Sequence, residues 1–151
     1  MREKAMEYLY EWSKKPYQKF IKRNCAWNVS MSKLKNYPKQ SLGFHLSRFL
    51  TKHNFEIQPK LENHDVFHVL TKTGISVPEE ISMQYHLLGN GKRSAYLFTV
   101  ILLGTLLFPD YLFFFRKAYS KGREALLFHS LDFSKMLHLP LERIKTTFLI
   151  K

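Results

Sequence analysis

Residues 60–73 read KLENHDVFHVLTKT, and this stretch sets the fold that we expect for the chain. Its apolar side chains recur at helical spacing, and Gly74 directly after it is a natural helix stop. In a helix, His64 and His68 stand at i and i+4 on one face, where both imidazoles can bind one cation. The stretch therefore predicts an amphipathic helix that carries part of a metal site.

Two adjacent glutamates follow in the next expected helix, and the spacing assigns them different roles. Ser76 and Glu79 have the spacing of a capping box, in which Ser76 caps the helix and the Glu79 side chain binds back to its backbone. Glu80 points about 100° further round the helix and stays available for a metal. His64, His68 and Glu80 then form a set of two histidines and one carboxylate, which leaves coordination positions open and suits zinc or non-haem iron.

Asp65 has two possible roles beside this set. One residue along a helix from His64, it lies about 100° away from that side chain and binds the same metal only if the helix unwinds locally. Otherwise it accepts a hydrogen bond from a ring N–H and fixes the tautomer of a ligating histidine. The remaining histidines have no comparable neighbours, and we expect surface or core positions for His45, His53, His86, His129 and His138.

Helical periodicity continues through the rest of the chain, and no stretch shows the sustained apolar and polar alternation of a strand. We therefore expect an all-α fold, a single-domain bundle of about seven to nine helices over residues 1–151. Residues 1–37 form a basic N-terminal helical arm and loop, and residues 38–151 form the core. Outside the metal-site region we expect helices at residues 1–12, 16–23, 41–52 and 95–108 and short helices up to residue 150, with residues 24–40 as a connecting loop.

Residues 95–115 are the one stretch that resembles a membrane span, because Asp110 is its only formal charge. Pro109 and Asp110 interrupt it after 14 residues, and such a helix is about 21 Å long, short of the roughly 30 Å hydrocarbon core. We expect residues 95–108 to form a buried central helix. Residues 111–115 are apolar all round, so they pack in the core or meet acyl chains, and basic side chains follow them as at a lipid headgroup surface.

The formal net charge is +12, and the excess is N-terminal: residues 1–60 hold 13 Lys or Arg against four acids, and residues 61–151 hold 11 against eight. Such a basic arm suits an anionic membrane surface, or it is a solvated face. No nucleic-acid motif accompanies it, so we expect no specific nucleic-acid binding. The single Cys25 excludes a disulfide framework and a thiolate zinc site, and no signal peptide is visible, so we expect a cytoplasmic protein, peripheral at the inner membrane face.

The pattern His-Asp-x-x-His-x11-Glu, at residues 64–80, resembles the signature of the coenzyme Q (ubiquinone) biosynthesis protein 4 family. Three further segments occur in the family's order: Ser41-Leu42-Gly43 after Pro38, Gly122-Arg123, and Pro140-Leu141-Glu142. The resemblance covers residue 38 to the end of the chain and indicates a short bacterial relative. Residues 59–63 lack the arginines of the basic run that family members often carry before the motif, so no head-group contact is carried over from that run.

The resemblance implies a helical protein with a divalent metal at His64, Asp65, His68 and Glu80, zinc first and iron(II) or manganese as alternatives. It also implies an apolar cavity for an isoprenoid or quinone-like ligand. The implied activity replaces the C1 carboxylate of a polyprenylated benzoquinone precursor by a hydroxyl, an oxidative decarboxylation. The implied partners are other quinone biosynthesis enzymes, and a homodimer is a further expectation.

Two other functions compete with this one. An HD-type metal phosphohydrolase also uses an adjacent His-Asp pair, and His45 or His53 with Asp132 would complete its site, although the spacings are poor and Glu80 would have no role. A non-enzymatic membrane-surface lipid-binding scaffold needs only the basic arm and the apolar helices.

Overall fold

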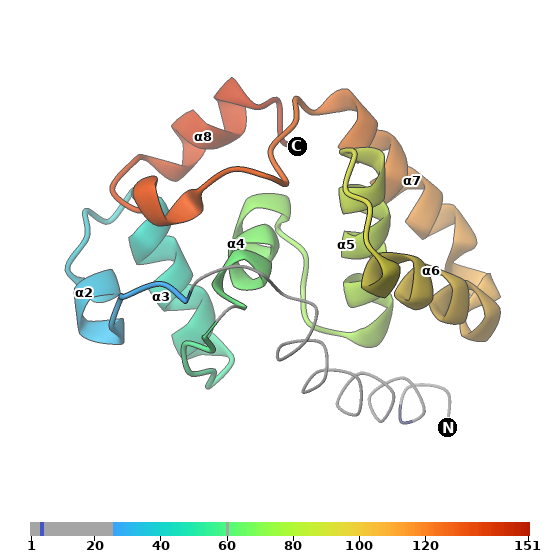
Figure 1. Ribbon diagram of the computed structural model, residues 1–151, viewed down its shortest axis with the longest axis horizontal. Coiled ribbons are helices and arrows are strands. Elements are labelled where there is room, and N and C mark those ends of the chain that lie inside the picture. The colour runs from blue at the N-terminus through green and yellow to red at the C-terminus, as the bar shows by residue number, and fades with distance from the viewer. Residues whose placement is uncertain (1–3, 5–25, 60) are drawn as a thin grey trace.

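The computed structural model describes residues 4, 26–59 and 61–151, and these residues form an all-α fold (Figure 1). Over this part of the chain there are seven α-helices and no strand, which confirms the expected fold class. The α-helices are α2 (Met31–Lys35), α3 (Leu42–Lys52), α4 (Glu62–Thr71), α5 (Val77–Gly89), α6 (Ala95–Leu107), α7 (Leu112–Glu124) and α8 (Leu141–Thr147), and the short 3-10 helices are η2 (Pro109–Tyr111) and η3 (Phe133–Lys135). Apart from residue 4, the helices expected at 1–12 and 16–23 lie outside the described residues, so the division at residue 37 stays a prediction.

The helix α2 corrects the expectation that residues 24–40 form only a loop. The Ser30 side chain accepts a hydrogen bond from the backbone N–H of Lys33 and caps the helix, as serine commonly does. Leu34 is the one fully buried side chain of α2, and it joins the main core. A five-residue helix with one buried side chain has no helical period to detect, which is why the sequence pattern missed it.

The C-terminal segment closes the core by pairing with the start of α3. The backbone N–H groups of Leu42 and Gly43 donate to the carbonyls of Leu139 and Leu137 at 2.9 and 2.8 Å. In the other direction, Leu141 N–H donates to the carbonyl of Gln40 at 2.8 Å. Figure 1 shows the result, in which the segment between η3 and α8 lies beside the start of α3, although the two are far apart in the sequence.

The helices α5 and α7 run alongside each other in backbone contact, and two glycines permit it. A Cβ atom on Gly122 would meet the carbonyl oxygen of His86, and one on Gly89 would meet that of Tyr119. The buried Asn90 then fastens the end of α5 to the segment after α7. Its side-chain oxygen accepts hydrogen bonds from the N–H groups of Phe128 and His129, both at 3.0 Å, and its amide donates to the carbonyl of Leu126 at 2.9 Å.

The helix α6 is not the buried central helix that we expected. Of its side chains only Leu97 and Gly104 are buried, whereas Phe98, Leu102 and Leu106 are 48, 62 and 69 % exposed. One side of α6 packs on α5, where Gly104 lies against Ile81. Because α6 is apolar on every side, its sequence has no polar face that could have revealed which side meets solvent.

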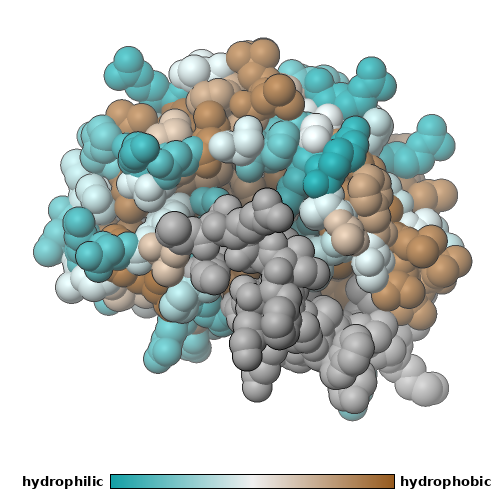
Figure 2. Space-filling view, in the orientation of Figure 1, coloured by the Kyte–Doolittle hydropathy of each residue, from teal (hydrophilic) through white to brown (hydrophobic). Residues whose placement is uncertain are grey.

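The helix α6 and the segment after it expose several large apolar side chains. We call them together the apolar face, and its members are Phe98, Leu102, Leu106, Tyr111, Leu112, Phe113 and Phe114. Figure 2 shows hydrophobic side chains gathered at the right edge of the molecule, over α6 and α7. No single helix in the described residues is long and apolar enough to cross a membrane, although α6 and η2–α7 pass that test together as a pair bent by 104°.

Candidate metal centre

The helix α4 presents both histidines of the predicted pair to one point. The Nε2 atoms of His64 and His68 lie 3.2 Å apart, as i and i+4 side chains on one helical face can. His68 is buried, whereas the His64 side chain is 18 % exposed. The pair is therefore built into the core on one side and reachable from outside on the other.

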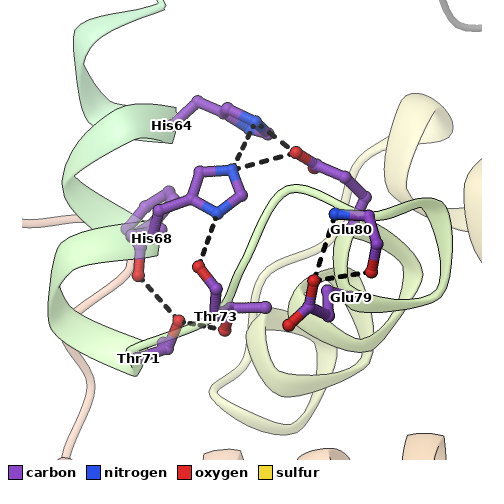
Figure 3. A network of polar contacts seen from close by, with 8 residues as sticks. His64, His68, Thr71, Thr73, Glu79 and Glu80 are labelled. Atoms are coloured by element: carbon purple, nitrogen blue, oxygen red, sulfur yellow. Dashed lines mark hydrogen bonds and ion pairs between the residues drawn. The ribbon is translucent and has the colours of Figure 1, made fainter. Parts of the chain in front are cut away.

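Glu80 reaches the same point from the first turns of α5 (Figure 3). One of its carboxylate oxygens lies 3.4 Å from His64 Nε2, and the other lies 3.0 Å from His68 Nε2. Tetrahedral zinc with ligands at about 2.0–2.1 Å requires ligand atoms about 3.3 Å apart, so the three residues fit such an ion. Among the described residues these three form one group whose ligand atoms lie within 4.8 Å of one another.

Glu79 performs the separate task that the sequence predicted. Its carboxylate accepts hydrogen bonds from the backbone N–H and the hydroxyl of Ser76, at 3.1 and 2.5 Å, and completes a capping box. The Ser76 hydroxyl is the main cause that lowers the pKa of Glu79. A Cβ atom on Gly74 would meet this carboxylate, so a larger residue there would displace the Glu79 side chain from its capping position. The capping role of Glu79 is confirmed, and Glu80 is left to face the histidines.

The protonation of His68 follows from its second ring nitrogen. Nδ1 lies 3.1 Å from the backbone carbonyl of Thr73, which only accepts, so Nδ1 carries a proton. A neutral His68 therefore presents the lone pair of Nε2 to Glu80 and His64, as a metal ligand must. The ring also stacks on Phe49, with centroids 5.2 Å apart and planes at 17°. These two contacts hold the imidazole in a ligating orientation.

When no cation is present, the negative charge of Glu80 favours a proton on His68. Burial by itself lowers the pKa of His68, but the hydrogen bond to Glu80 and the charge of Glu80 outweigh it, and the net pKa is raised. Burial by itself raises the pKa of Glu80, but the charge of His64 and hydrogen bonds from both histidines lower it to about 2. A divalent cation would take the place of the proton on His68 and keep Glu80 ionised.

Asp65 follows His64 in the sequence but is not one of the three residues, His64, His68 and Glu80, whose ligand atoms lie together; we call these three the metal group. Burial raises the pKa of its carboxyl to about 6, and the charges of His64 and His68 oppose that rise. Asp65 is thus close enough to respond to both histidines. Its participation as a metal ligand stays a prediction.

The other candidate residues lie elsewhere. Asp132 is exposed and binds the Ser134 hydroxyl at 2.5 Å and the Lys135 ammonium at 2.9 Å. His53 packs on Phe49, with ring centroids 4.9 Å apart, and does not belong to the group of ligand atoms. Within the described residues the metal group includes none of the other histidines, which are His45, His53, His86, His129 and His138.

Sequence reasoning missed Thr73 and Phe49. Thr73 acts through its backbone carbonyl, which every residue type has, so no side-chain signal could reveal it. Phe49 lies in α3 and looked like one more apolar position of a helical stripe.

The comparisons with known proteins agree with the fold. No protein-family model and no curated protein matches the sequence. A similar solved structure is the crystal structure of a protein of Nostoc punctiforme PCC 73102 named as a putative ubiquinone biosynthesis protein. The two chains superpose with a TM-score of 0.69 at 14 % sequence identity, over 99 % of this chain and 81 % of that one. At this identity the likeness shows a shared fold.

The first prediction separates the two adjacent glutamates. We expect Glu80→Gln to weaken zinc binding by at least about 100-fold, because it removes a direct ligand, and loss of a residue that only supports a ligand already costs about 10–100-fold. Glu79→Gln is the matched control and should bind zinc like the wild type while lowering the melting temperature, since it weakens the capping box. Isothermal titration calorimetry on untagged protein measures both affinities, and equal losses in the two variants would contradict the assignment.

The second prediction concerns pH. Because the pKa of His68 is raised and a metal must displace its proton, zinc affinity should fall about tenfold per pH unit for each proton displaced, once the pH is below that pKa. Glu80, with a pKa of about 2, stays ionised between about pH 5 and 8 and adds nothing to this slope. Titrations in buffers of different ionisation enthalpy count the protons released. Zinc affinity that does not change over this range would contradict a protonated His68 in the metal-free protein.

Proposed function

We propose that this chain is a metal-dependent protein of quinone or isoprenoid-lipid metabolism. The observation that supports this most directly is the convergence of His64, His68 and Glu80 from two helices at separations that suit a tetrahedral divalent ion. It occurs in a fold shared with a protein named for ubiquinone biosynthesis. The proposed reaction is an oxidative decarboxylation with dioxygen as the two-electron oxidant. The C1 carboxylate of a polyprenylated benzoquinone precursor leaves as carbon dioxide, a hydroxyl from water takes its place, and dioxygen is reduced to hydrogen peroxide.

The residues of the site suit an anionic aromatic head group. A divalent ion bound here, with zinc first and iron(II) or manganese as alternatives, would supply a Lewis acid for carboxylate and ring oxygens. His68 is fixed from behind by Thr73 and Phe49 and is 2 % exposed. The Glu80 side chain is 27 % exposed, and His64 is also partly exposed, so a substrate would approach on the side of these two. By neutralising the substrate carboxylate, the ion would lower the free-energy cost of moving the head group out of water along with the apolar tail.

The third prediction tests the reaction itself. Wild-type protein loaded with zinc, iron(II) or manganese is incubated aerobically with a short-tailed prenylated hydroxybenzoate, and mass spectrometry monitors exchange of the carboxylate for hydroxyl. We expect conversion by the wild type and by Glu79→Gln, and at least about a 100-fold slower reaction by Glu80→Gln, because only that variant loses a ligand. Conversion that Glu80→Gln leaves unchanged would contradict a role for the metal group.

A second candidate function, a non-enzymatic membrane-surface lipid-binding scaffold, is favoured by the apolar face. Phe113 is 83 % exposed, and soluble domains seldom expose a contiguous apolar surface without a partner. Arg116 and Lys117 are exposed on α7 directly after it, where they would meet anionic headgroups. The scaffold role needs no reaction at the metal group. It would be favoured if the protein binds lipid but does not convert the prenylated hydroxybenzoate with zinc, iron(II) or manganese bound.

The fourth prediction tests the apolar face. Phe113→Asp should lower the partition of the protein onto anionic vesicles by at least about 10-fold, because burying a phenylalanine side chain contributes about 1.5–3 kcal/mol. Leu127→Asp is the matched control, since Leu127 is 64 % exposed but lies outside α6 and α7. Vesicle flotation at two salt concentrations measures the partition, and binding should weaken as salt screens the basic residues. Equal effects of the two substitutions would argue against this face.

A further inference from the structure

A row of aromatic rings leads from the metal group to the surface at the end of α3. The ring of Phe49 stacks on that of His68 at 5.2 Å between centroids, and its other neighbour, His53, is 4.9 Å away. Phe55 completes the row, with its centroid 5.6 Å from that of His53 and 6.3 Å from that of Phe49. Phe55 is 39 % exposed. We call Phe49, His53 and Phe55 the ring row, and it forms one surface that begins beside a metal-group histidine and ends in solvent.

The backbone at the end of α3 holds these rings in place. Asn54 has a positive φ of 54°, and the backbone N–H of Phe55 donates to the carbonyl of Leu50 at 2.9 Å, which closes the helix. A helix end of this kind commonly brings two apolar side chains together, and here they are Phe49 and Phe55. Any pair of apolar side chains can make that contact. The helix end therefore explains neither the third ring, His53, nor the exposure of Phe55.

The apolar face has no such connection with the metal group. Within the described residues, the rings of His64 and His68 contact each other, at 4.8 Å between centroids, and the ring of His68 contacts Phe49 of the ring row. Rings of the apolar face contact one another instead, as Tyr111 and Phe114 do at 6.5 Å. An apolar chain attached to a head group at the metal would therefore meet continuous aromatic surface at the ring row.

We propose that the ring row binds the apolar tail of the ligand whose head group binds the metal group. This inference rests on the proposed function and places the tail along the end of α3. Aromatic side chains offer large apolar areas and contribute strongly to binding. A tail lying on Phe55 would remove the exposed part of that ring from water, which is favourable.

Ligand binding to the zinc-loaded full chain tests the ring row. The probes are a geranylated hydroxybenzoate and the same hydroxybenzoate without its tail, and calorimetry at about pH 8, where histidine is neutral, measures both dissociation constants. Their ratio is the tail gain, which we expect to be at least about 10-fold for the wild type, because a bound tail buries apolar surface. Phe55→Ser should lower the tail gain about threefold or more, since it removes a ring that the tail covers. It should leave the affinities for zinc and for the tail-less compound unchanged.

Further variants separate binding by the rings from a loss of structure. His53→Ser should also lower the tail gain, whereas His53→Phe keeps a ring and should retain it, so the test stands even if Phe55→Ser does not fold. Leu127→Ser is the matched control, because Leu127 is 64 % exposed and lies outside the ring row and the apolar face. It should keep the tail gain of the wild type. The melting temperature of each variant verifies that it is folded.

The outcomes distinguish this inference from the proposed function. If the zinc-loaded wild type binds neither compound, both are overturned. If the wild type binds the two compounds equally, or if Phe55→Ser and His53→Ser keep the full tail gain, only the ring row is excluded. A tail gain that Phe113→Ser lowers and Phe55→Ser does not would overturn the ring row and assign the tail to the apolar face.

Discussion

The contact between the backbones of α5 and α7 is the constraint on which the rest of the arrangement depends. At Gly89 and Gly122 the helices approach so closely that a single added carbon would meet a carbonyl oxygen. Side-chain packing at larger separations tolerates small shifts, whereas direct backbone contact tolerates very little. Asn90 adds hydrogen bonds to the chain after α7. With one end of α5 fixed in this way, Glu80 at its other end has a defined position opposite α4.

The metal group shows how the fold keeps a partly buried carboxylate ionised. Glu80 would favour its neutral form on burial, yet two imidazoles within 3.4 Å reverse that preference. Neutral imidazoles alone do not balance the charge of Glu80, and either a proton on His68 or a divalent cation can supply the positive charge. Because the cation must displace the proton, metal affinity depends on pH. Thr73 and Phe49 hold the His68 ring in the same orientation with either one bound.

The sequence predicted the parts of the site that depend on helical spacing and on capping. His64 and His68 meet because residues four apart share a helical face, and Glu79 and Glu80 differ because the third residue of a capped helix binds back to its cap. Prediction failed where local pattern carries no information. The helix α2 is shorter than two turns, and α6 is apolar on all sides, so only the tertiary packing of Ile81 against Gly104 decides which side is covered.

The relation between α5 and α6 connects the metal group with the apolar face. Glu80 and Ile81 are adjacent in α5, so their side chains point about 100° apart: one toward the histidines and the other onto Gly104 of α6. The outer side of α6 carries Leu102 and Leu106, which are largely exposed. If that side rests on a lipid surface, the metal group lies one helix away from it. An amphiphile could then place a charged head near Glu80 while its tail stays in an apolar environment, and a freely soluble substrate would gain nothing from this arrangement.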